Sequence, residues 1–225
     1  MDDYKAKEMA RDSMAKALAA ANPRLVPVSE KVNSLVAAAK NMRIELKAAF
    51  PRVKFAVRTE RYSMGNSINV DWEDGPVGVQ VEAIIFKYSG GNFDGMTDSY
   101  EYRRSAWTDA FGKGKYVFAN RRYSDVAVAS ALRTVFARGF MPVPDSAASG
   151  PSEKGAVEIV RNAVRAFRNG NMWNVRVVGT DDSLQTLVNL ELSRRTWALT
   201  KGCDPFVPER GNRGRLVRVA GKVSL

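Results

Sequence analysis

The sequence predicts an α+β protein, in which a small antiparallel sheet packed with helices precedes a smaller, basic α+β C-terminal part. Side chains alternate between apolar and polar over residues 54–62 and 67–73, which is typical of half-buried strands. Apolar residues recur at helical spacing in several other segments. A Pro-, Ser- and Ala-rich segment at 141–152 has the composition of a linker. We therefore expect an N-terminal domain over 1–140 and a C-terminal region over 153–225.

The first 50 residues predict two helices. Residues 4–20 are rich in Ala, Lys and Met, and Asn22-Pro23 should end this helix because a proline disfavours helical geometry in the residue before it. A second helix is expected from Ser29, a suitable N-cap, to Phe50.

A hairpin and a third helix should follow. Met64-Gly65-Asn66 between the two alternating runs has hairpin-turn chemistry. The segment from Pro76 to Tyr88 carries a helical apolar stripe, although Val79, Val81 and Ala83 also alternate, so a strand is the alternative. We favour the helix.

The segment after this helix should be a loop containing Asp94, Asp98 and Glu101, because it is rich in Gly and Asp. Alternation predicts a strand from Lys115 to Tyr123. Ser124 or Asp125 should cap a helix that runs to about Arg138, and Gly139 suits its C-terminal end.

The C-terminal region predicts two further helices and two strands. A helix capped by Ser152 should run to Asn169, and a strand should follow at Trp173–Val178. Asp181 or Asp182 should cap a helix through Ala198, and residues 217–225 alternate as a terminal strand would.

The composition excludes several kinds of catalytic, metal and disulfide chemistry. The chain has no histidine and one cysteine, Cys203, so imidazole zinc sites, Ser-His-Asp catalysis and an internal disulfide are ruled out. No phosphate-cradling glycine loop or dinucleotide fingerprint is present, and no cofactor is expected. The charged N-terminal sequence and the lack of a long apolar run predict a protein of the bacterial cytoplasm with no membrane partner.

The net charge of +11 favours a polyanionic partner, and arginine predominates among the basic residues of the C-terminal region. We expect binding by one face of the helix after the linker and by the Gly- and Arg-rich segment near the C-terminus. The candidate residues for contact with nucleic acid or another partner are Lys154, Arg161, Arg165, Arg168, Arg210, Arg213, Arg215 and Arg218. Aromatic residues beside arginines, such as Tyr62, Trp107, Tyr123 and Trp173, could stack on bases, but core or edge positions are favoured for them.

An acidic cluster is the one constellation that could perform chemistry. Asp71 and Glu73 project from the same face of one expected strand, and such oxygens could hold Mg²⁺ for phosphodiester cleavage. Pairing with Arg58, Arg61 or Arg103 is the alternative, and it is favoured because structural ion pairs explain most clusters of this kind.

Two motifs resemble one of the large polyvalent protein-associated domains, which recur in proteins of phages, prophages and conjugative plasmids. The resemblance covers residues 50–136, and its most specific parts are SINVDWEDGP and FDGMTDSYEY. It implies an origin in a mobile element, whose proteins often accompany DNA into a new host or act against host defence. It implies no catalytic residues.

Taken together, these features predict a non-enzymatic, phage- or plasmid-encoded counter-defence protein that binds nucleic acid or a host defence complex containing nucleic acid. One alternative is a stoichiometric inhibitor of a host defence enzyme, of the anti-CRISPR or anti-restriction type. A second alternative is a metal-dependent nuclease that uses Asp71 and Glu73.

Overall fold

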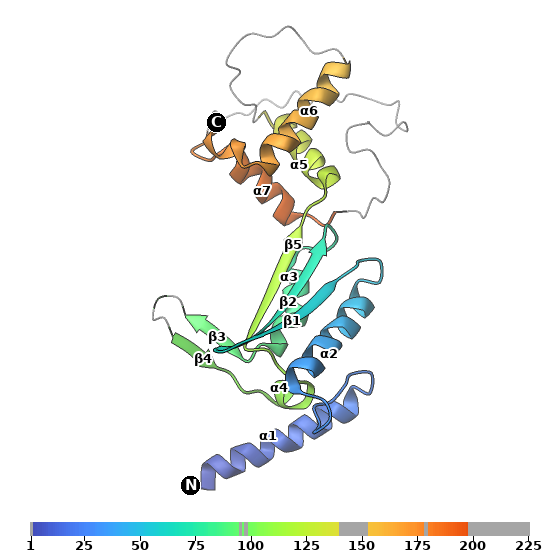
Figure 1. Cartoon of the computed structure of the whole chain (residues 1–225), viewed down its shortest axis with the longest axis vertical. Helices are drawn as coiled ribbons and strands as arrows, with labels where there is room; N and C mark the ends of the chain where they lie inside the picture. Colours follow the sequence, from blue (N-terminus) through green and yellow to red (C-terminus); the bar gives the residue numbers. More distant parts are fainter. Residues whose placement is uncertain (1, 95, 97–98, 140–152, 178–179, 198–225) are drawn as a thin grey trace, which may run out of the picture.

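The computed structural model confirms the α+β class (Figure 1). It describes residues 2–94, 96, 99–139, 153–177 and 180–197. The linker expected at 141–152 and the strand expected at 217–225 lie outside these residues. No helix within the described ranges is both long enough and apolar enough to cross a membrane.

A three-stranded sheet in the order β1-β2-β5 forms the centre of the fold. Strands β1 (Ala56–Tyr62) and β2 (Gly65–Glu73) form the expected antiparallel hairpin. Strand β5 (Tyr116–Arg122) pairs with β2 in parallel, so the expectation of a purely antiparallel sheet is wrong. The chain leaves β2 through a helix and returns in the same direction, as a crossover between parallel strands requires.

Two helices cover one face of this sheet. Helix α2 (Ser34–Ala49) packs on β1 and β2, and helix α3 (Gly78–Ile85), extended by the 3-10 turn η1 (Phe86–Tyr88), packs beside β5. The helix that was favoured over a strand for residues 76–88 is thus confirmed. The residues buried between the sheet and the helices include Met42, Leu46, Ile68, Val70, Trp72, Val81 and Ile85.

Helix α2 begins four residues later than the sequence suggested. Its N-cap is Asn33, whose side-chain oxygen accepts from the Leu35 amide, whereas Ser29 forms an isolated bridge with Val32. Asparagine is as good an N-cap as serine, so capping preference does not distinguish Ser29 from Asn33.

The segment expected to be a loop contains a small hairpin. Strand β3 (Gly91–Asp94) pairs with β4 (Ser99–Tyr102), and the short helix α4 (Ala106–Phe111), which the sequence did not indicate, follows them. Helix α1 (Asp2–Ala21) packs on α4, where the Arg11 guanidinium donates to the Asp109 carboxylate at 2.7 Å.

A second hydrophobic cluster joins α5 (Asp125–Ala137), α6 (Glu153–Arg168) and α7 (Leu184–Arg194) beyond the end of the sheet (Figure 1). Helix α5, assigned from the sequence to the N-terminal domain, therefore packs with the helices that follow the linker. Ser124 caps α5 as expected, and Ser183, not Asp181 or Asp182, caps α7. The strand expected at 173–178 is wrong: the 3-10 turn η2 (Asn171–Asn174) and an isolated bridge between Arg176 and Ser183 occupy its place.

Candidate nucleic-acid interface

The sheet face opposite α2 and α3 presents both charged and aromatic side chains to solvent. Pairing places Arg58, Asn69 and Phe118 side by side across the three strands. The Phe118 ring is 47% exposed, and the side chains of Arg58 and Arg122 are 61% and 72% exposed. We call the set that shares this side the open sheet face; it includes the charged residues Arg58, Glu60, Asp71, Glu73 and Arg122 and the neutral residues Asn69, Tyr116, Phe118 and Asn120.

Four aromatic rings run from the small hairpin onto this face, and we call Tyr102, Tyr100, Tyr116 and Phe118 the aromatic row. The centroids of successive rings are 4.8, 5.2 and 6.2 Å apart. The last two rings are nearly parallel, with 9° between their planes. Tyr102 at one end is 75% exposed, so both ends of the row are open to a ligand.

Lys115 places a positive charge beside this row. Its ammonium lies 5.1, 6.0 and 5.4 Å from the ring centroids of Tyr100, Tyr102 and Tyr116, within the range of cation–π attraction. The ammonium donates to the Met64 carbonyl at 3.0 Å. An ammonium has three donors, so Lys115 retains hydrogen-bonding capacity for an anion.

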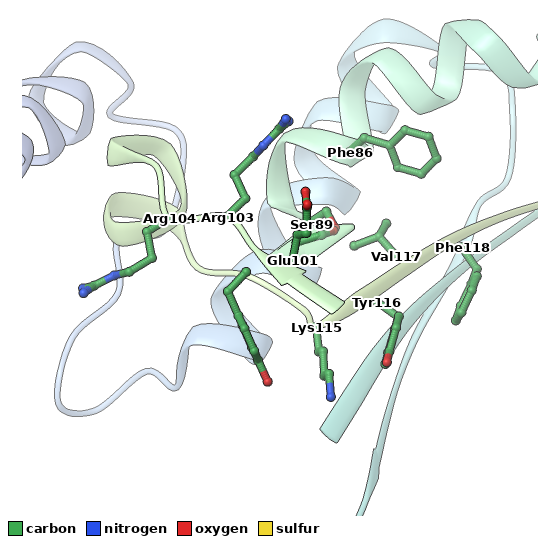
Figure 2. Close-up of a pocket in the computed structure, with 11 residues that line it drawn as sticks. Phe86, Ser89, Glu101, Arg103, Arg104, Lys115, Tyr116, Val117 and Phe118 are labelled. Carbon is green, nitrogen blue, oxygen red and sulfur yellow. The ribbon is translucent and has the colours of Figure 1, made fainter. Parts of the chain in front are cut away.

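A cavity of about 680 Å³ adjoins the row where the hairpin diverges from β5. Figure 2 shows Val117 pointing toward Phe86 on one side of the strand, and Tyr116 and Phe118 pointing to the other side. The charged residues of the lining are Glu101, Arg103, Arg104 and Lys115. The volume is typical of pockets that hold small molecules, and the cavity therefore has room for a nucleotide.

Tyr100 anchors the hairpin to the sheet. Its hydroxyl donates to the Lys115 carbonyl. Burial raises the pKa of Tyr100 to about 12, and the neighbouring phenols of Tyr116, Tyr102 and Tyr62 add to the rise. The neutral phenol is therefore the form that fits this site.

The Tyr100→Phe variant should lose a phenol that titrates at a pKa of about 12. Because the folded-state pKa lies above the unfolded value of 10.0, the unfolded chain releases this proton first. The parent should therefore lose stability relative to the variant as pH rises from 10 through 12. Spectrophotometric titration of tyrosinate and urea unfolding across this range check both expectations. A parent–variant difference that does not change with pH would contradict them.

The acidic candidates on the sheet are engaged by arginines. An Asp71 carboxylate oxygen lies 2.7 Å from the Arg58 guanidinium, and the other oxygen lies 3.7 Å from that of Arg122. Glu73 lies on the same side of β2 and is exposed. The described residues contain no group of three acidic or cysteine side chains placed to hold a metal ion. The ion-pair interpretation, with Arg58 as the partner, is the one that this geometry supports.

The basic candidates of the C-terminal region divide into two groups. Lys154, Arg161, Arg165 and Arg168 all lie on α6. Arg161, Arg165 and Arg168 are all exposed, and Arg168 also binds the Asp125 carboxylate at 2.8 Å and the Tyr123 carbonyl. Arg210, Arg213, Arg215 and Arg218 lie outside the described residues.

Sequence reasoning missed the aromatic row as a candidate site. The alternation of Tyr116, Phe118 and Asn120 was recognised, but it did not reveal which side of the strand faces solvent. Tyr100 and Tyr102 alternate around Glu101, which is the signal that could have identified β4. Trp107, one of the aromatic residues weighed for stacking, packs against Tyr88 and Phe111 in the core as expected.

Fold and site together define a small α+β protein with a helix-covered sheet whose other face is open and carries aromatic side chains and charged side chains of both signs. Residues 34–124 match the family model of large polyvalent protein associated domain 29, which confirms the resemblance over this segment and indicates an origin in a phage or another mobile element. The open sheet face, the aromatic row and Lys115 all fall within the matched residues. Neither the search of curated proteins nor that of solved structures gave a match.

Proposed function

We propose that this chain is a non-enzymatic, nucleic-acid-binding protein that a phage or conjugative element uses against host defence. The observation that carries the proposal is the open sheet face, where exposed aromatic rings lie beside exposed guanidinium groups. Arginine contacts phosphate well, and aromatic rings stack on bases. The net charge of +11 supplies the long-range attraction that such binding uses.

The electrostatics of the face favour a binding surface over a reaction centre. Asp71 is held between Arg58 and Arg122, so its carboxylate is already engaged by two guanidinium groups. Glu60 and Glu73 are exposed on the same side of the sheet. Both guanidiniums remain more than half exposed while they hold the aspartate, and they keep donors for phosphate oxygens. The exposed Arg161 and Arg165 on α6 extend the basic character beyond the sheet.

A salt series tests the proposal directly. Fluorescence anisotropy with labelled single- and double-stranded DNA and RNA should show affinity that falls steeply as salt rises, because bound phosphates release counterions. The double variant Arg58→Gln/Arg122→Gln should reduce the slope of log affinity against log salt by about two. Lys40→Gln/Lys47→Gln is the matched control, because it removes the same charge from exposed positions of α2, the helix that covers the other face.

Equal slopes for the two double variants would show that the sheet face does not contact phosphate. Undetectable binding to every nucleic acid at low salt would overturn the proposal and favour a protein inhibitor instead. The counter-defence role has its own readout: expression in a host that restricts incoming DNA should raise transformation by unmodified plasmid. Transformation that does not change in restricting hosts and in hosts with CRISPR defence would contradict this role.

A further inference from the structure

We infer that the aromatic row takes the unpaired bases of a single strand, and that the cavity beside β5 receives one base and prefers those with an exocyclic amino group. This inference rests on the proposed function and specifies the form of nucleic acid that the site binds. Three observations carry it: the spacing of the rings, the position of the cavity alongside the row, and the carboxylate of Glu101 among its lining residues.

The rings suit stacking on separate bases. Tyr116 and Phe118 are two residues apart on one strand, so their side chains project from the same side of β5. Their planes are 9° apart and their centroids 6.2 Å apart, so two successive bases could each lie on a ring. Base faces are covered in a duplex and free in a single strand, and this geometry therefore selects the single strand.

The positive charges lie where the backbone of such a strand would pass. Lys115 borders the row at the hairpin side, and Arg58 lies farther across the sheet, separated from Phe118 by Asn69 of β2. The Arg103 side chain borders the cavity and is exposed. A strand with its bases on the row would thus have cations on both sides for its phosphates.

The cavity offers surface for a base beside cations that could hold its phosphate, because Arg103, Arg104 and Lys115 also belong to its lining. Phe86, 48% exposed, and Val117 supply apolar surface. The Ser89 hydroxyl is already used, since it donates to the Gly91 carbonyl at 2.6 Å. Glu101 provides a carboxylate, which repels phosphate but accepts a hydrogen bond from an amino group such as N4 of cytosine. Thymine and uracil present a carbonyl at the same position, which a carboxylate cannot bind.

The test uses the full chain with labelled oligonucleotides of equal length, made of deoxycytidine only, of thymidine only, or as a mixed-sequence duplex. Anisotropy should show both single strands bound more tightly than the duplex. Oligo-dC should exceed oligo-dT by about three- to tenfold. The two pyrimidines have rings of the same size, so this comparison separates the amino group from stacking.

Four variants locate the contacts. Phe118→Ala should weaken single-strand binding by about 5- to 100-fold, whereas Phe118→Tyr, which keeps a ring, should not. Glu101→Gln should abolish the preference for oligo-dC, because an amide both accepts and donates. Tyr102→Ala removes a more exposed ring of the row and provides a second test of stacking. Circular dichroism checks that each variant is folded.

Several results would overturn the inference. Duplex binding as tight as single-strand binding, or full affinity in both Phe118→Ala and Tyr102→Ala, would remove the stacking role while the proposed function stands. An oligo-dC preference that survives Glu101→Gln would remove the role of the cavity. Absence of binding to all nucleic acids would overturn the proposed function as well, and capture of a protein partner would then be the outcome to examine.

Discussion

Replacing Asn41 with leucine should lower the free energy of unfolding by about 3–5 kcal/mol. Asn41 is fully buried on α2, between the segment that precedes this helix and the end of α4. Its side-chain oxygen accepts from the Val26 amide at 2.7 Å, and its amide group donates to the Val26 and Phe111 carbonyls at 2.8 and 3.1 Å. Leucine has a similar size but cannot hydrogen-bond, so it would leave three backbone groups without a partner in an apolar setting.

Urea unfolding followed by circular dichroism measures this loss. Asn33→Ala is the matched control, because it changes the same residue type at the N-cap of the same helix, where the loss should be only about 1 kcal/mol. If the Asn41 variant unfolds at the urea concentration of the control, the backbone groups of Val26 and Phe111 have found other partners and the argument fails.

The central hairpin could be predicted from the sequence because two signals coincide there. Alternation over both strands fixes which side chains share a face, and the turn residues between them fix the pairing. The pairing of β5 had no such signal. A period of two identifies a strand, but it does not reveal the neighbour of that strand or the direction of the pairing, which depend on the path of α3 and the hairpin.

The exposed side of β5, where the candidate site lies, could not be predicted for a different reason. Along β5, Tyr116 and Phe118 alternate with Val117 and Ala119, so both sides of the strand carry apolar groups and the pattern does not identify the buried side. Only the position of α3 decides that Val117 packs inward and Phe118 remains exposed. Conversely, the resemblance over two short motifs located the matched segment, because such motifs depend on residue identity and not on tertiary packing.

The second large effect is expected at Arg121, where the sheet meets the helical cluster of α5, α6 and α7. Its guanidinium donates to the carbonyls of Asp74 and Gly75 at 3.1 and 2.8 Å, and to those of Leu192 and Arg195 at 3.4 and 2.7 Å. The first two carbonyls belong to the turn after β2, and the other two belong to the last turn of α7 and the residue that follows it. Burial lowers the pKa of this guanidinium, but an arginine remains charged at neutral pH.

Arg121→Met should therefore cost about 3 kcal/mol, since it removes a charged donor from four carbonyls and leaves an apolar stem in its place. Because the two hydrophobic clusters would lose this connection, we expect the helical cluster to unfold before the sheet. Circular dichroism and tryptophan fluorescence should then give separate urea transitions, which coincide in the parent. Arg122→Met is the matched control on the adjacent, exposed position of β5. A single transition shared by both probes in Arg121→Met would show that the remaining contacts, such as the Ser124 amide donating to Asp74 at 2.9 Å, suffice to keep the clusters cooperative.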